Sequence, residues 1–228
     1  MAGKQQGKQQ GKQQKRNSNM NGNKKNGKNN KVSTKGIIGI CIAAVVVIAV
    51  VAGICLSLAK EPKTYLAKIE IQDYGTVTVQ LDAKAAPVTV ENFVKLAGEG
   101  FYDSLTFHRI IEGFMMQGGD PNGNGTGGSG KNIKGEFSAN GVNNTLSHTR
   151  GAVSMARSQK YDSASSQFFI VQQDSTYLDG QYAVFGYVTD GMDIVDKICT
   201  EAEPVDNNGT IPADAQPVIT RITIEGQK

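Results

Sequence analysis

Hydrophobic and polar positions alternate in two short stretches of the chain, at residues 65–71 and 76–81. A period of two predicts β-strands that bury one of their faces. The sequence Asp-Tyr-Gly at 73–75 separates the two stretches and predicts a turn between them. We therefore expect a strand, a turn and a second strand at this point of the chain.

A helical pattern follows, with apolar residues three or four positions apart after Pro87: Val90, Phe93, Val94 and Ala97. Proline is favoured at the first position of a helix, and glycines such as Gly98 and Gly100 commonly end one. A second helix is predicted at residues 192–198 by a similar but shorter pattern. The chain is thus expected to contain two helices after residue 65.

The remaining apolar runs are short, at residues 107–111, 151–155, 167–171, 182–188 and 218–224. Clusters of Gly, Asn, Asp and Ser separate them, as is typical of strands joined by turns. Strands that alternated with helices would instead indicate a parallel sheet. We predict a mainly antiparallel sheet closed into a barrel, with two helices.

Residues 1–35 differ sharply from the rest, because they consist almost wholly of Lys, Gln, Asn and Gly and repeat the unit GKQQ three times. They carry ten basic and no acidic residues, which leaves 14 basic and 21 acidic residues, a net charge of −7, for the rest of the chain. Such a segment buries too little apolar surface to fold, so we predict a disordered tail. No aromatic residues accompany the lysines, and we therefore expect contact with anionic lipid rather than nucleic acid.

Residues 36–59 form an uncharged, apolar run of 24 residues. As a helix this run would be about 36 Å long, enough for a membrane span. The lysines before it predict a cytoplasmic N-terminus and a C-terminal domain, residues 65–226 after a linker at 60–64, outside a bacterial membrane. A signal peptide cleaved after Ala59 is the alternative, since Ser57 and Ala59 have the small side chains of a cleavage site.

The C-terminal domain offers few of the residues that metal, redox or nucleophilic chemistry requires. Cys199 is its single cysteine, so no disulfide is expected within it, and two histidines provide no metal-binding spacing. The glycines at 123, 125 and 128 match a dinucleotide-binding pattern, but polar residues flank them, which favours a loop. A Ser-His-Asp hydrolase using His148 stays open, although no nucleophile-elbow sequence supports it.

Two longer segments stand out, because residues 107–120 read FHRIIEGFMMQGGD and residues 166–170 read SQFFI. They resemble the two signature segments of cyclophilins. The resemblance continues through GTGG at 125–128, GAVSMA at 151–156, LDG at 178–180 and VFG at 184–186. It extends in order over about residues 65–224.

This resemblance implies a closed eight-stranded antiparallel β-barrel capped by two helices, with peptidyl-prolyl cis-trans isomerase activity and neither cofactor nor metal. It implies that Arg109 is catalytic and that Gln117 acts beside it. The residues that it implies for substrate binding are Phe114, Met115, Ala156, Arg157, Gln167, Phe169, Tyr177, Leu178 and Tyr182. The expected partners are proline-containing polypeptides, such as secreted or surface proteins that are still folding, and the protein is expected to be a monomer.

Three of these positions depart from the pattern of many family members. Tyr177 stands where many have Trp, Tyr182 where they have His, and Arg157 where Asn is frequent. Tyrosine keeps an aromatic face and a hydrogen-bond donor, so catalysis is expected to survive. A tethered module or chaperone that binds proline segments, with incidental turnover, is the alternative function.

Overall fold

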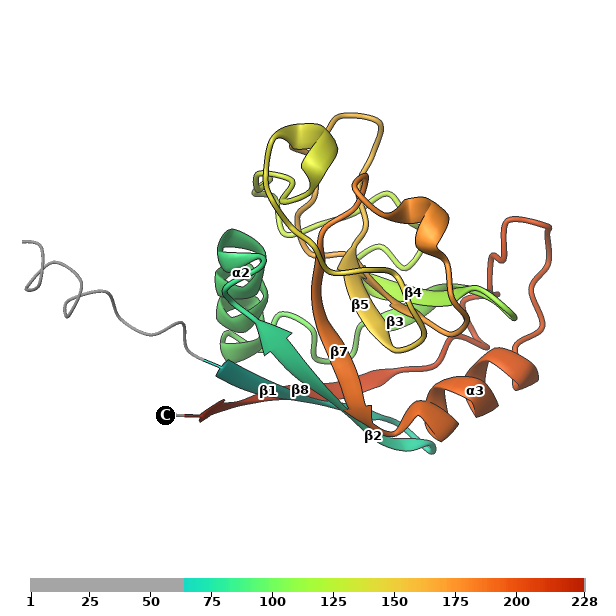
Figure 1. Ribbon diagram of the computed structural model, residues 1–228. Helices are drawn as coiled ribbons and strands as arrows, with labels where there is room; N and C mark the ends of the chain where they lie inside the picture. The colour runs from blue at the N-terminus through green and yellow to red at the C-terminus, as the bar shows by residue number, and fades with distance from the viewer. Residues whose placement is uncertain (1–63, 228) are drawn as a thin grey trace, which may run out of the picture. The chain divides into compact units, whose positions relative to one another are not determined.

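The computed structural model describes residues 64–227, which are coloured in Figure 1. The predicted tail at 1–35, the predicted span at 36–59 and residues 60–63 of the predicted linker lie outside these residues. Within residues 64–227, no helix is both long enough and apolar enough to cross a membrane.

Eight strands and two α-helices make up the described part of the chain. In chain order they are β1 (Thr64–Ile71), β2 (Gly75–Asp82), α2 (Pro87–Gly98), β3 (Thr106–Ile111), β4 (Met115–Asp120), β5 (Ala152–Met155), β6 (Phe168–Val171), β7 (Val184–Asp190), α3 (Met192–Glu201) and β8 (Ile219–Gln227). Two short 3-10 helices, η1 (Ser138–Asn140) and η2 (Thr176–Leu178), lie in the loops. The prediction of a mainly β fold with two helices is confirmed.

All eight strands belong to one antiparallel sheet in the order β3-β4-β6-β5-β7-β2-β1-β8. The sheet curls until its end strands approach each other, but β3 and β8 share no continuous ladder. Thr106 pairs with Val218 in an isolated bridge, and the amide of Phe107 donates to the carbonyl of Pro217. Proline has no N–H to donate in return, which interrupts the ladder at this seam. The eight strands therefore form a curled half-barrel, and the predicted closed barrel is wrong at the seam between β3 and β8.

Strand β4 is absent from the predicted elements, because Gln117, two glycines and Asp120 interrupt its apolar pattern. Its neighbours β3 and β6 hold it in place through antiparallel pairing on both edges. A Cβ atom on Gly118 would lie 2.7 Å from the carbonyl oxygen of Thr106. Glycine is thus required here by the close approach of two backbones, which hydrophobic periodicity does not reveal.

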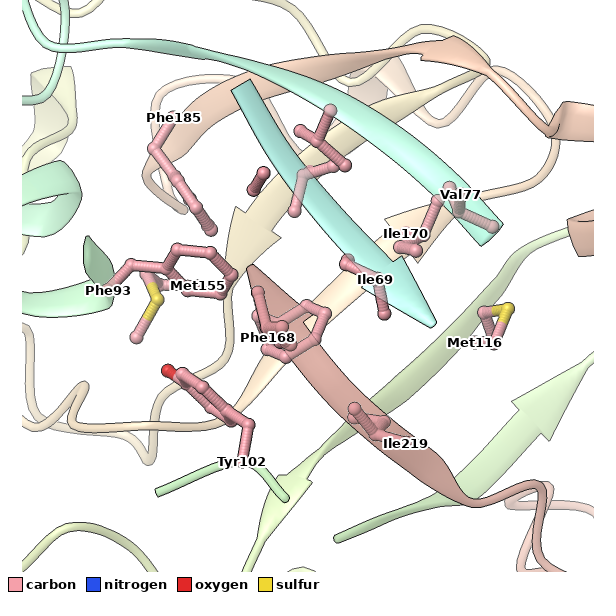
Figure 2. Close-up of a cluster of buried hydrophobic side chains, with 14 of the residues drawn as sticks. Ile69, Val77, Phe93, Tyr102, Met116, Met155, Phe168, Ile170, Phe185 and Ile219 are labelled. Atoms are coloured by element: carbon pink, nitrogen blue, oxygen red, sulfur yellow. The ribbon is translucent and has the colours of Figure 1, made fainter. Parts of the chain in front are cut away.

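The main core lies inside the curled sheet and is built around aromatic rings (Figure 2). Phe93 of α2 meets Tyr102, Phe168 and Phe185 with ring centroids 5.2, 5.4 and 5.2 Å away. Such tilted and edge-on contacts add to the burial of the rings themselves. Phe93 therefore fastens α2 to strands β6 and β7.

A second apolar cluster covers the other face of the sheet at strands β4, β6, β5 and β7. Its buried members are Met115, Ala152, Phe169, Val171 and Val184. Strands β5 and β6 are consequently buried on both faces, which explains why β6 is a continuous apolar run and why the buried Ser154 alone interrupts the apolar residues of β5. Leu178 of η2 and the loop residues Leu146, Ala156 and Tyr182 pack against this cluster, and the candidate site lies there.

Helix α2 begins with Pro87, as predicted, but its first turn is capped by a distant residue. The buried carboxylate of Glu136 accepts hydrogen bonds from the amides of Val88, at 3.0 Å, and Thr89, at 2.7 Å. These amides have no partner within the helix, and a negative charge is favourable at a helix N-terminus. Glu136 therefore links α2 to the loop that follows β4.

Candidate active site

One row of residues crosses four neighbouring strands. Arg109 on β3 lies opposite Gln117 on β4. Gln117 lies opposite Phe169 on β6, which in turn lies opposite Ser154 on β5. Residues directly opposite one another on adjacent strands direct their side chains to the same face. The register therefore gathers an arginine, a glutamine and a phenylalanine that are far apart in sequence.

The guanidinium group of Arg109 is held by a loop between α3 and β8. Its Nε atom donates to the carbonyl oxygen of Asn208 at 2.7 Å, and its Nη1 atom lies 3.7 Å from the sulfur of Met115. Burial lowers the pKa of Arg109 from its usual value, and neighbouring groups including Asp206 oppose that shift. An arginine remains protonated at physiological pH under such conditions. The site thus contains a permanent cation with a fixed orientation.

The loop that holds Arg109 is itself tightly constrained. The carboxylate of Asp206 accepts the amides of Asn208 and Thr210, each at 3.0 Å. Gly209 has φ +82°, and a Cβ atom there would lie 2.5 Å from the carbonyl oxygen of Ile110. Only glycine fits this left-handed, crowded position. Sequence reasoning missed this loop, and the Asn-Asn-Gly turn at 207–209 was the only signal for it.

A chain of amide groups fixes Gln117. Its Nε2 atom donates to Oε1 of Gln167 at 2.8 Å, and Nε2 of Gln167 donates to the carbonyls of Gly125, at 3.1 Å, and Gly127, at 2.8 Å. The buried carboxylate of Asp120 holds that glycine-rich loop by accepting the amide of Gly125 at 2.6 Å. The loop predicted in place of a dinucleotide site therefore positions a side chain of the candidate active site.

A hollow of about 300 Å³ opens between these groups. Its lining comprises nine of the eleven predicted site residues, namely Arg109, Phe114, Met115, Gln117, Ala156, Arg157, Phe169, Leu178 and Tyr182. The lining combines apolar side chains with two arginines and Gln117. Such a hollow suits a small apolar ring attached to a polar backbone.

The remaining two predicted residues lie beside this hollow. Gln167 lines a second hollow of about 480 Å³, which shares Gln117, Ala156 and Arg157 with the first. The Tyr177 side chain is exposed, and its ring centroid lies 6.0 Å from that of Phe114. The structure therefore brings the eleven predicted residues to one continuous surface.

The backbone at Ala156 and Arg157 does not belong to a strand, since β5 ends at Met155. The amide of Ala156 already donates to the carbonyl of Gln167 at 3.0 Å. This amide is therefore not free to pair with a further backbone at this edge.

Beneath the hollow, His148 lies in a Ser-His-Asp arrangement. Its Nδ1 atom lies 2.8 Å from Oδ1 of Asp179, and its Nε2 atom lies 3.0 Å from the hydroxyl of Ser154. Ser154 is 0% exposed, so its hydroxyl meets no substrate. The hydrolase alternative is therefore wrong, because the arrangement is internal. The imidazole instead stacks under Phe169, with ring centroids 5.9 Å apart.

Comparisons with known proteins agree with this geometry. Residues 66–225 match the family model described as "Cyclophilin type peptidyl-prolyl cis-trans isomerase/CLD". The chain therefore belongs to the cyclophilin-type peptidyl-prolyl cis-trans isomerase family.

Individual relatives and solved structures support this assignment. The chain is 50% identical over 123 residues to peptidyl-prolyl cis-trans isomerase B of Bacillus subtilis (strain 168), covering 54% of this chain and 82% of the relative. It is 46% identical over 138 residues to a peptidyl-prolyl cis-trans isomerase of Helicobacter pylori, covering 60% and 81%. A crystal structure of a Cryptosporidium parvum cyclophilin in the presence of the dipeptide Ala-Pro is similar with a TM-score of 0.62 and 30% identity, covering 71% of this chain and 99% of that one.

The buried histidines generate a prediction about pH. Burial lowers the pKa of both His108 and His148, and it outweighs the nearby carboxylates of Asp120 and Asp179, which act in the opposite direction. Both imidazoles therefore take up protons in the folded state only at a lower pH than in the unfolded chain, which protonates them below about pH 6.5. The unfolded state binds more protons, so the free energy of unfolding should fall as the pH drops below that value.

Urea unfolding followed by circular dichroism at pH 7.5 and 5.5 measures this effect. The fall should reach at most about 1.4 kcal/mol per pH unit for each histidine. It should be smaller in His148→Gln, where only His108 remains of the two histidines in the sequence. A variant whose free energy of unfolding falls as much as that of the wild type between these pH values would contradict the lowered pKa of His148.

Proposed function

We propose that this chain catalyses rotation about X-Pro peptide bonds, with the proline ring in the hollow beside Arg109. The observation that carries the proposal is the fixed guanidinium of Arg109 at the edge of an apolar hollow, held by the carbonyl of Asn208. Two bacterial relatives that are peptidyl-prolyl cis-trans isomerases by name and the similar Cryptosporidium parvum structure in the presence of Ala-Pro support it. The reaction breaks no covalent single bond and therefore needs no nucleophile.

The chemical task is to remove amide resonance, which gives peptide bonds a barrier of about 18–20 kcal/mol. Uncatalysed prolyl isomerisation takes tens to hundreds of seconds, so an ordinary turnover of about 10 per second requires roughly 4 kcal/mol of stabilisation. One well-placed donor in a site with little water contributes on that order. The energetic requirement is thus within reach of a single side chain.

Arg109 supplies such a donor in this account. As the amide twists, the proline nitrogen becomes pyramidal and gains a lone pair that accepts a hydrogen bond. The planar ground state has no comparable acceptor at nitrogen, so a donor fixed there stabilises the transition state more than the substrate. The hydrogen bond from Arg109 to Asn208 fixes the group before the substrate binds, which reduces the cost of ordering it.

The apolar wall of the hollow performs the second part of the task. Phe114, Met115, Phe169 and Leu178 form a surface for the proline ring. Their contact excludes water, which would otherwise favour the more polar planar amide. Gln117, fixed by Gln167, is available to hold the carbonyl or amide groups of the substrate backbone.

Arg109→Ala tests the proposal in the full-length protein, kept in mild detergent because of the apolar run at 36–59. Its kcat/KM for a proline peptide should fall by about a hundredfold or more, because a preorganised donor is lost. The matched control is Arg221→Ala, which removes an exposed arginine of β8 away from the hollow. A variant Arg109→Ala that isomerises the peptide as fast as the control would contradict the mechanism.

The alternative of a binding module makes a different prediction for the same variant. An inactive Arg109→Ala protein would then still restore the phenotype of a strain that lacks the gene. The enzymatic function predicts that this variant does not restore it, whereas Arg221→Ala does. Peptide binding by a wild-type protein without turnover would also favour the binding module.

We further propose that the protein acts as a monomer tethered to the outer side of a bacterial membrane, on secreted or surface proteins that are folding. The uncharged run at 36–59 and the lysines before it support this orientation. A tether would raise the local concentration of the enzyme near emerging chains.

Protease added to intact cells tests this orientation. The C-terminal domain should be digested while a cytoplasmic marker protein stays intact. Protection of both proteins until the cells are lysed would contradict the proposed location. The intact mass of the mature protein then separates a retained anchor from cleavage after Ala59.

A further inference from the structure

Arg157 is a second fixed guanidinium beside the hollow, and no part of the proposed mechanism uses it. Its Nε atom donates to the carbonyl of Gln181 and its Nη1 atom to the carbonyl of Ser158, each at 2.9 Å. Three aromatic rings surround its central carbon, those of Phe137 at 5.1 Å, Tyr161 at 5.2 Å and Tyr182 at 4.5 Å. These contacts fix a cation whose long side chain would otherwise be mobile.

The charge of Arg157 is not neutralised by a neighbouring carboxylate. Within residues 64–227, no Asp or Glu oxygen lies within 4.0 Å of its nitrogens. Its Nη2 atom donates to no acceptor in the same part of the chain. The rings and backbone carbonyls hold the group, but they leave its Nη2 atom to donate to a ligand.

Both hollows of the site share this cation. Arg157 lines the hollow that contains Arg109 and also the larger hollow that contains Gln167. Among the described residues that line either hollow, none is acidic. The rest of the chain outside residues 1–35 has 21 acidic and 14 basic residues. A positive groove in a domain of negative net charge attracts and orients anionic ligands.

We infer that Arg157 determines substrate specificity by selecting proline segments that carry an Asp or Glu within about three residues of the proline. This inference rests on the proposed function. A segment whose proline occupies the first hollow lays its neighbouring residues towards the second, at about 3.3 Å per residue in an extended chain. Arg157 lies at the junction of the two hollows, where the side chain of such a residue passes.

The charge of the Arg157 guanidinium favours a carboxylate over an amide of the same shape. A carboxylate carries the opposite charge and accepts a charge-assisted hydrogen bond from Nη2, whereas glutamine offers a neutral acceptor. Replacing Glu by Gln in a substrate therefore isolates the contribution of charge at nearly constant size. Because the group is half-buried, the preference should also weaken as salt screens it.

The test uses pairs of peptides that contain one proline. The two peptides of a pair differ only in having Glu or Gln at one position, which is each of the three positions before and after the proline in turn. The full-length protein in mild detergent is assayed at low and high salt. For at least one position, kcat/KM for the Glu peptide should exceed that for the Gln peptide by about fivefold at low salt, and by less at high salt.

Variants separate recognition from a structural role of Arg157. Arg157→Gln should bring the Glu/Gln ratio close to one, and Arg157→Lys should retain part of it, because a lysine keeps the charge but loses the fork. The matched control Arg221→Gln changes the net charge equally at an exposed position on β8 and should keep the full ratio. A purely structural role would slow both peptides together and leave the ratio unchanged.

The outcomes distinguish this inference from the proposed function. If the wild type isomerises both peptides of every pair equally well, isomerase activity stands and selection by Arg157 is overturned. If it isomerises none of the peptides, the proposed function itself fails. A ratio that survives in Arg157→Gln also overturns the inference, because another group must then recognise the carboxylate.

Discussion

The candidate site depends on the register of four strands, β3, β4, β6 and β5. This register sets Arg109, Gln117 and Phe169 in one row on one face of the sheet. A slip of a single residue would turn each side chain to the opposite face and send Arg109 into the main core. The close approach of β3 and β4 at Gly118 and the two apolar clusters on either side of β6 fix this register.

Three aspartates fix the loops beside these strands through hydrogen bonds to the loop backbone. Asp120 holds the glycine-rich loop whose carbonyls position Gln167, and Asp206 holds the turn whose carbonyl positions Arg109. Asp179 binds both the backbone and the ring of His148, which lies beneath Phe169. Each carboxylate accepts donors of a loop that would otherwise lack a regular partner. The loops beside the candidate site are therefore as constrained in position as the strands that carry Arg109, Gln117 and Phe169.

Much of the fold follows from local patterns in the sequence, whereas the site does not. Alternation predicts β1 and β2, and Pro87 with Gly98 bounds α2 closely. Phe114 and Phe169 have the periodicity of ordinary core residues, so only the resemblance to a known family distinguished them. The contact between Arg109 and Asn208 joins residues 99 positions apart and leaves no mark in either local sequence. Strand β4 and the open seam at Pro217 were missed because backbone approach, rather than hydrophobicity, determines them.

The central claim is that a rigid, oriented donor at Arg109 accelerates rotation of a bound proline peptide. Exchange NMR on the Arg109→Lys protein at saturating peptide measures the cis-trans interconversion rate of the bound peptide separately from its Kd. The account predicts that the rate falls by about tenfold or more while Kd changes by less than about threefold, because lysine retains the charge but cannot keep the fork held by Asn208. An unchanged interconversion rate on the variant would contradict it.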